Sequence, residues 1–285
     1  MIKFGPSGNS QSFYAMGYKH TAQAPDYLEK FNLDCFEYSF GRGVNISEEK
    51  ALEIGAVFAA EGKEISVHAP YFINFANPSN EAAEKSFNYV LDSAKFLKLF
   101  GGKRLVFHPA AQGKATREQA VALTCERLKT LRDLVYQNGY DDLYFCPETM
   151  GKLAQIGTLE EVVEFCKIDK IYLPAVDFGH LNAREQGSLQ TSQDYKLRLE
   201  FMIDELGYER VKHFHVHFSK IMYSAKGEVK HLTFADNVYG PEFAPLAVAL
   251  KQLKLEPYIV CESDGTQAED AVTMKEIYNS IDMRL

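Results

Sequence analysis

The stretch Ile171-Tyr172-Leu173-Pro174-Ala175-Val176-Asp177-Phe178-Gly179-His180 is an apolar run that ends in a carboxylate, with an imidazole three residues further on. Gly179 lets the chain bend between the two. Asp177 and His180 can then face the same side of a strand-to-loop junction, where they can bind one metal ion or two adjacent ions. On its own, an Asp-x-x-His pattern is weak evidence for a metal site. An aspartate that caps a turn, followed by a solvent-exposed histidine, produces the same pattern.

The same layout, an apolar run that ends on a potential metal ligand, occurs five more times. The residues at the ends of these runs are His68, His108, Glu148, His217 and Glu262. Together with Asp177 they stand one per predicted strand, from the third strand to the eighth. The eight predicted strands are residues 2–5, 34–38, 64–68, 103–108, 143–148, 171–177, 211–217 and 258–262.

Predicted helices alternate with these strands: Ser47, Thr116 and Thr158 are expected N-caps, and Gly101-Gly102 is an expected helix end. Parallel strands need crossover helices, and eight such units close most naturally into a (β/α)8 TIM barrel. A doubly wound sheet is the alternative, but it would need a Gly-rich phosphate loop after an early strand, and the sequence has none. Because no segment resembles a linker, we expect a single barrel domain over residues 1–285.

Composition limits the possible functions. The 46% hydrophobic and 25% charged residues are ordinary for a globular protein. A formal net charge of −8 gives no overall attraction to nucleic acid or to an anionic membrane, so a polyanionic ligand would need local basic residues or bound cations.

No stretch is long enough to span a bilayer, and residues 1–6 lack an apolar signal core. Five cysteines without a Cys-x-x-Cys pair indicate reduced thiols and a cytoplasmic location. With no apolar surface stripe to indicate a protein partner, a monomer is the default expectation.

In a barrel of this kind the C-terminal strand ends form the mouth, where catalytic groups lie. Three imidazoles and three carboxylates meeting there favour Zn²⁺ or Mn²⁺ over Ca²⁺ or Mg²⁺, which prefer oxygen ligands. Six groups exceed one tetrahedral site, so we predict at least two ions that share a bridging carboxylate. Any one of these residues alone could be an ordinary polar group of the core or a loop. Six ligand-type residues that each stand at the end of a predicted strand argue against that explanation.

Three histidines share one face of the predicted strand 211–217, because side chains alternate along a strand. His217 is nearest the mouth and is assigned as the ligand. His215 is expected behind the ligands or in the core, and His213 lies too far from the mouth. His20 precedes a predicted helix and is expected at the surface.

This constellation resembles the endonuclease IV family, the multi-zinc apurinic/apyrimidinic endonucleases among the xylose isomerase-like barrels. The resemblance covers nearly the whole chain in the order and spacing of motifs. The matching segments are Val67-His68-Ala69-Pro70-Tyr71-Phe72-Ile73-Asn74, Phe107-His108-Pro109, Glu148-Thr149-Met150-Gly151, Asp177-Phe178-Gly179-His180, His217-Phe218-Ser219-Lys220, Lys230-His231 and Cys261-Glu262.

The resemblance implies three zinc sites, of which the first two are expected to be filled. One ion would be held by His68, His108 and Glu148, and Glu148 would bridge to a second ion. The second ion would also be held by Asp177, His217 and Glu262, and a third by His180 and His231.

The chain departs from the family pattern at the third site. The family completes this site with an aspartate two residues before the last histidine, and Val229 stands there instead. Glu228, by a one-residue shift, or Asp236 could replace it. The family's Asn after the bridging Glu and its Asn-Asp pair after the strand-seven His are also missing, and Ser219-Lys220 replaces the pair.

The resulting hypothesis is a phosphodiesterase that cleaves DNA 5′ to abasic sites in base excision repair. A hydroxide generated by zinc would attack the phosphorus, with Glu148 positioning it. Tyr71 matches the family tyrosine that enters the base stack, Arg42 is a candidate second wedge, and Lys220 opens a loop of lysines beside the metals. Scattered lysines are equally well explained as a solvated face.

Two other functions remain open. Sugar isomerases and epimerases of similar architecture hold one metal with Glu, Asp, His and Glu from strands five to eight. Glu148, Asp177, His217 and Glu262 fit that set, with the two glutamates as an acid–base pair. His68 and His108 have no role in such an enzyme, which favours the nuclease. A barrel that binds damaged DNA or metal without turnover is the third possibility, supported only by Val229.

Overall fold

Eight parallel strands form a closed barrel in the computed structural model, which describes residues 1–282. The barrel strands are β1 (Lys3–Pro6), β2 (Cys35–Ser39), β3 (Glu64–His68), β4 (Arg104–Phe107), β6 (Tyr144–Pro147), β8 (Ala175–Asp177), β9 (His215–Phe218) and β12 (Tyr258–Cys261). They pair as two four-stranded sheets, β1-β12-β9-β8 and β2-β3-β4-β6. Parallel bridges join the sheets at both seams, Ser7 to Glu37 on one side and Glu148 to Ala175 on the other. The fold is therefore the predicted TIM barrel.

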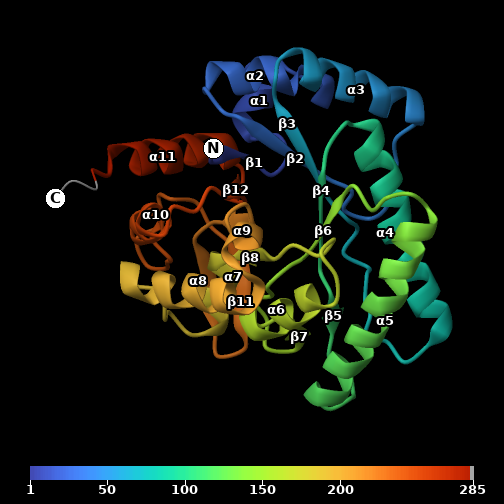
Figure 1. The fold of residues 1–285 in the computed structure, drawn as a ribbon. Helices are drawn as coiled ribbons and strands as arrows, with labels where there is room; N and C mark the ends of the chain where they lie inside the picture. Colours follow the sequence, from blue (N-terminus) through green and yellow to red (C-terminus); the bar gives the residue numbers. More distant parts are fainter. Residues whose placement is uncertain (283–285) are drawn as a thin grey trace.

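Helices connect the strands and lie outside the barrel (Figure 1). The expected caps are present: Ser47 accepts from the Lys50 amide, and Thr116 and Thr158 each form a capping box. The longer helices are α3 (Glu48–Ala60), α4 (Asn80–Leu99), α5 (Arg117–Gln137), α6 (Leu159–Lys167), α8 (Ser192–Leu206), α10 (Phe243–Gln252) and α11 (Gln267–Ser280). The shorter ones are α1 (Gln11–Ala15), the 3-10 helix η1 (Thr21–Gln23), α2 (Ala24–Lys30), α7 (Phe178–Arg184) and α9 (Tyr208–Val211).

The main hydrophobic core lies between the strands and the surrounding helices, and Phe107, Phe145 and Phe178 are among its fully buried side chains. Two smaller buried clusters on the strands are separate from it: Val106, Cys146, Leu173 and Ala175, and Cys35, Tyr258 and Val260. Side chains on alternate faces of a barrel strand point outward and inward, so we assign the small clusters to the barrel interior.

Two short antiparallel pairs add to the loops that follow the barrel strands. One pairs β5 (Ala110–Ala111) with β7 (Gln155–Ile156), and the other is the hairpin β10 (Ile221–Ser224) and β11 (Gly227–His231). The hairpin docks on the loop after β6, since the Glu228 amide donates to the Gly151 carbonyl. The sequence did not predict this hairpin, although it carries residues that matter for the site.

Three local predictions were wrong. The strand predicted over 211–217 begins at His215, because Val211 ends α9 and His213 lies exposed in the turn that follows. The run 171–177 forms a strand only over its last three residues, since Pro174 cannot donate a ladder hydrogen bond. Gly179 is not a bend but part of α7, where a Cβ would lie 2.6 Å from the Ser219 carbonyl oxygen.

Among residues 1–282, no helix combines the length and the apolar character that a membrane span requires. All five cysteines are unpaired, and four of them are buried. The last three residues of the predicted domain 1–285 lie outside the described residues.

Candidate metal centre

All six ligand-type residues lie at the C-terminal ends of consecutive barrel strands. His68 and Asp177 end β3 and β8, and His217 is the last residue but one of β9. His108, Glu148 and Glu262 directly follow β4, β6 and β12. Because the strands are parallel and the barrel is closed, these side chains converge at one mouth.

Glu148 stands between two sets of histidines. Its Oε2 lies 3.1 Å from His68 Nε2 and 3.2 Å from His108 Nε2. Its Oε1 lies 3.0 Å from His217 Nδ1 and 3.5 Å from His180 Nδ1. The side chain is almost fully buried. A carboxylate whose two oxygens face different donor sets has the arrangement of a ligand that bridges two ions.

The predicted ligands at the mouth form three groups in which the donor atoms of all members lie within 4.8 Å of one another. The groups are His68, His108 and Glu148; Glu148, Asp177, His217 and Glu262; and Asp177, His180 and His231. Asp177 Oδ1 accepts from the His180 amide and caps α7, whereas its buried Oδ2 has no hydrogen-bond partner and lies 3.2 Å from His180 Nδ1 as an ion pair. A buried carboxylate oxygen without a partner costs free energy unless a cation compensates it. The donor set therefore fits divalent metal ions with mixed nitrogen and oxygen ligands.

Four histidines of the centre each have one ring nitrogen in contact with a group that is not among the predicted ligands. The Nδ1 atoms of His68, His180 and His231 lie 2.8 to 2.9 Å from the Ala69 carbonyl, the Thr149 carbonyl and the Ser219 hydroxyl. His217 is reversed: its Nε2 faces Glu37 and its Nδ1 faces Glu148. Such outer partners fix the tautomer and orientation of metal-binding histidines.

Burial and the charges of neighbouring side chains shift the pKa values of the residues at the centre. Burial alone would raise the pKa of Glu148, but attraction to His217 and hydrogen bonds from neighbouring histidines hold it well below its ordinary value. Burial and repulsion from Glu262 and Glu148 raise the pKa of Asp177 to about 6, against the attraction of His180 and His231. Burial alone would lower the pKa of His68, but the hydrogen bond and charge of Glu148 raise it to about 9.

His108 and Glu262 are less enclosed than their neighbours. Burial and repulsion from His68 and His180 lower the pKa of His108, despite its contact with Glu148. Burial would raise the pKa of Glu262, but attraction to His217 and His231 lowers it. The carboxylates of the mouth therefore face imidazoles whose pKa values are raised, those of His68, His180 and His217, in the place where cations would lie.

Glu228, rather than Asp236, lies at the third group. Its Oε2 is 3.4 Å from His180 Nε2. Gly151 permits this approach, since a Cβ there would lie 2.6 Å from the Glu228 Cβ. Asp236 instead accepts from the Val238 and Tyr239 amides and closes its own loop. Val229, at the position of the family's aspartate, is half-exposed and offers no ligand atom.

A cavity of about 240 Å³ opens above the centre, lined by His68, Tyr71, His108, Met150, Lys152, His180, Glu228, His231 and Glu262 among others. Tyr71 and the neighbouring Phe72 are both more than half exposed. The Tyr71 amide donates to the Gly41 carbonyl, which places the exposed Arg42 close by. A larger cavity, about 620 Å³, lies where the strands begin, and none of the ligand-type residues lines it.

Lys220 does not lie on the open mouth, which corrects its predicted place among the surface lysines. It is 5% exposed, and its ammonium donates to the Asp236 carbonyl at 2.7 Å and pairs with Glu242 at 2.7 Å. Its charge is thus neutralised within the protein. Lys152, which lines the cavity and is exposed, is the better-placed cation.

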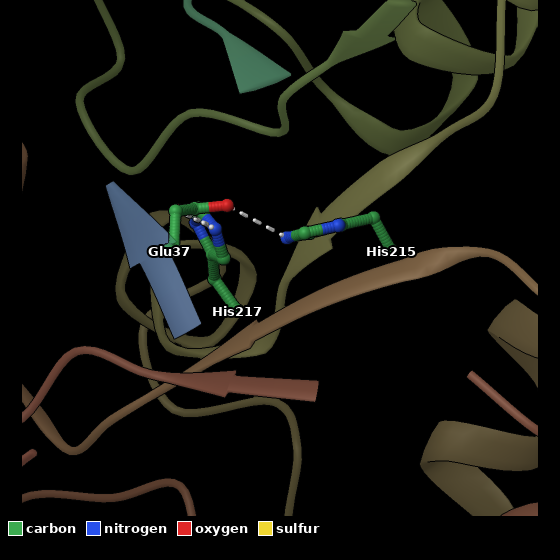
Figure 2. A group of neighbouring side chains, drawn as sticks. All are labelled: Glu37, His215 and His217. Atoms are coloured by element: carbon green, nitrogen blue, oxygen red, sulfur yellow. Dashed lines mark ion pairs between the residues drawn. The ribbon is translucent and has the colours of Figure 1, made fainter. Parts of the chain in front are cut away.

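Glu37 is a residue that the sequence analysis missed. It lies in the middle of β2, is fully buried, and contacts both His215 and His217 (Figure 2). His215 itself has no contact with Glu148, in keeping with its expected place behind the ligands. A charged residue within an otherwise apolar strand was the available signal, but the sequence does not tell which face of β2 it occupies.

The closed barrel, with ligand-type residues at its C-terminal mouth, indicates the class of protein, and the comparisons agree. The model of the xylose isomerase-like TIM barrel family matches residues 25–278, and the chain belongs to this family.

Individual relatives differ in what they are named. An uncharacterized protein of Methanocaldococcus jannaschii is 30% identical over 261 residues, covering 91% of this chain and 92% of that protein. A probable endonuclease 4 of Mycoplasmoides gallisepticum is 34% identical over 94 residues, which span 33% of this chain and 30% of that protein.

Solved structures share the fold at low identity. A 3-keto-D-glucoside 4-epimerase from E. coli superposes with a TM-score of 0.67 at 16% identity, covering 99% of this chain and 100% of the epimerase. Endonuclease IV from Thermus thermophilus superposes with a TM-score of 0.64 at 18% identity, covering 93% of this chain and 94% of the endonuclease. At these identities the likeness concerns the fold alone.

Proposed function

We propose that this protein is a metal-dependent phosphodiesterase that cleaves DNA 5′ to abasic sites, as an endonuclease IV-like repair enzyme. The main support for this proposal is the position of Glu148, whose two carboxylate oxygens face separate sets of histidines. Two adjacent ions suit phosphodiester hydrolysis, which needs charge stabilised on both the attacking and the leaving oxygen. Several partial relatives named probable endonuclease 4 support the same choice.

Under this proposal His68, His108 and Glu148 hold one zinc ion, and Glu148, Asp177, His217 and Glu262 hold the second. His180, His231 and Glu228 would hold a third. When bound, the ions supply an activated water and offset the charge of the phosphodiester. Glu148 is the residue we place at the reacting atoms, because it lies between both groups and is shielded from solvent.

The rim of the cavity suits a bulky, partly apolar ligand. Tyr71 and Phe72 present two exposed aromatic faces beside the metal groups, and exposed aromatic or apolar side chains can enter a base stack at a lesion. Arg42, in the loop after β2, and Lys152, in the loop after β6, are both exposed. They and the bound cations would provide local attraction for DNA, which the net charge of −8 does not.

The direct test is cleavage of a duplex that carries one abasic site by the zinc-loaded protein. We expect a single cut on the 5′ side of the lesion that leaves a 3′-hydroxyl. Undamaged duplex of the same sequence is the control substrate and should stay intact. Fully metallated protein that leaves the abasic duplex uncut would contradict the proposal.

A sugar epimerase is the second candidate, because Glu148, Asp177, His217 and Glu262 also form a compact one-metal group. In that case Glu148 and Glu262 would exchange a proton with the sugar carbon. Incubating the protein with ketohexoses and Mn²⁺, then separating the products, distinguishes the two. An epimerase would have no role for His68 and His108, so we favour the phosphodiesterase over the epimerase.

A further inference from the structure

Glu37 is a buried carboxylate held between two imidazoles inside the barrel. Its Oε1 lies 2.8 Å from His217 Nε2, and its Oε2 lies 3.2 Å from His215 Nε2. The Ser66 hydroxyl donates to the same Oε2 at 2.8 Å. Glu37, His215 and His217 are all 0% exposed. Figure 2 shows the carboxylate between the two rings. A charge buried this deeply is costly unless neighbouring groups compensate it.

His217 connects Glu37 to the metal centre. Its Nδ1 lies 3.0 Å from Glu148 Oε1 and 3.6 Å from Glu262 Oε2. A neutral imidazole carries one proton and one lone pair, so the contact on one nitrogen determines what the other can offer. Glu37 contacts Nε2 as an ion pair, although neither Glu37 Oε1 nor His217 Nε2 meets hydrogen-bond geometry. A carboxylate at Nε2 favours the tautomer that carries its proton there, which leaves the lone pair on Nδ1, facing the ligand group. Without Glu37, the buried Nε2 would lose the carboxylate that compensates it.

His215 and Ser66 hold Glu37 in place. The His215 ring stacks on Tyr258, with ring centroids 5.2 Å apart and an angle of 26° between the planes. It also packs edge-on against His217, at 5.0 Å between centroids. Glu37 and His215 do not line the cavity at the mouth, so neither can touch a substrate there. Their effect on the centre must pass through His217.

We propose that Glu37 is a positioning residue that orients His217 and fixes its tautomer, so that Nδ1 is directed at the ion shared with Glu148, Asp177 and Glu262. The proposal rests on the role of His217 as a metal ligand, which the endonuclease and the epimerase readings share. It is therefore independent of the substrate. The competing explanation is that Glu37, His215 and His217 themselves hold a further ion, since their donor atoms lie within 4.8 Å of one another.

The test measures zinc binding by E37Q in competition with a chromophoric chelator, without DNA or sugar. Gln keeps the size of the side chain but loses its charge. Loss of an outer partner typically weakens metal affinity by about 10–100-fold, so we expect one ion to bind that much more weakly in E37Q. The remaining ions should keep their affinity, and the number bound at saturating zinc should equal that of the wild type.

H213Q is the matched control, because His213 is an exposed histidine just before the same strand and lies outside the centre. It should bind zinc as the wild type does. Should E37Q fail to fold, H215Q leaves Glu37 and its Ser66 hydrogen bond in place and removes the His215 ring, both its contact with Oε2 and its packing on Tyr258 and His217. H215Q is expected to bind the same ion more weakly than the wild type, by a smaller factor than E37Q.

Three results would overturn the proposal. The first is that E37Q binds zinc with wild-type affinity. The second, for the case in which E37Q does not fold, is that H215Q binds zinc with wild-type affinity. The third is that E37Q binds one zinc ion fewer than the wild type at saturating zinc. The last of these would make Glu37 a ligand. Because the measurement uses no substrate, a failure to cleave abasic DNA leaves this result unaffected, and the two proposals fail separately.

Discussion

Glu148 belongs to both of the donor groups that would form the two-metal centre, and this sharing has a measurable consequence. Replacing it with Gln removes the charge that faces His68 and His108 on one side and His217 on the other. We expect E148Q to lose affinity for two ions at once and to lose abasic-site cleavage entirely. Metal analysis after gel filtration measures the first effect. Loss of one ion with the other bound normally would contradict a bridging role.

The protonation of His68 gives a second prediction at the residue scale. Despite burial, the hydrogen bond and charge of Glu148 raise the pKa of His68 to about 9, so we expect His68 to carry a proton at pH 7.5, whereas a ligand must be neutral. Zinc binding should therefore release protons at this pH. Calorimetric titrations in buffers of different ionisation enthalpy measure the number. The release should decrease as the pH rises through 9, and a binding heat independent of the buffer at pH 7.5 would argue against the prediction.

At the scale of single elements, the hairpin β10–β11 decides whether a third ion can bind. Glu228 on β11 reaches His180, whereas Asp236 in the following loop is occupied by backbone amides. We expect E228Q to lose the third ion and to keep the other two. D236N is the matched control, with unchanged zinc content. If D236N loses an ion and E228Q does not, the assignment of Glu228 is wrong.

The loop after β3 carries the aromatic pair at the rim. Replacing Tyr71 with Ala should leave zinc content unchanged, because its side chain is not among the donor groups. A stacking contact with a base is worth about 1–3 kcal/mol, so affinity for abasic duplex should fall by roughly 5- to 150-fold. Y136A changes an exposed tyrosine on α5 and is the control. Equal DNA affinity of Y71A and wild type, measured by fluorescence anisotropy, would remove Tyr71 from the interface.

For the molecule as a whole, bound ions should stabilise the barrel, because the proposed ligands come from six of its eight strands. A ligand at about 1,000 times its Kd adds about 4 kcal/mol to the free energy of unfolding. Chelation should therefore lower Tm by on the order of 10 °C. We further propose that the chain is one domain, and expect a single unfolding transition by calorimetry. Two separate transitions in the metal-free protein would contradict this.

The sequence predicted the barrel and its mouth because strand ends leave a local trace: an apolar run that stops at a ligand-type residue. His68, Glu148 and Glu262 were found in this way. Other features depend on contacts far apart in the chain. Glu37 is within reach of His217 only after the barrel closes, and Lys220 turns inward only because Glu242 lies opposite it. The run from Val211 to His217 looks like one strand because no Gly or Pro in the sequence marks the end of α9 at Val211.

The central claim is that two ions lie side by side at the mouth and share Glu148. A crystal structure of the zinc-loaded protein, with anomalous scattering recorded at the zinc edge, tests it most directly. We predict two peaks about 3.5–4 Å apart on either side of the Glu148 carboxylate, one of them contacted by His68 and His108. A single peak among Glu148, Asp177, His217 and Glu262, with His68 and His108 bound to no ion, would contradict the account and favour the epimerase.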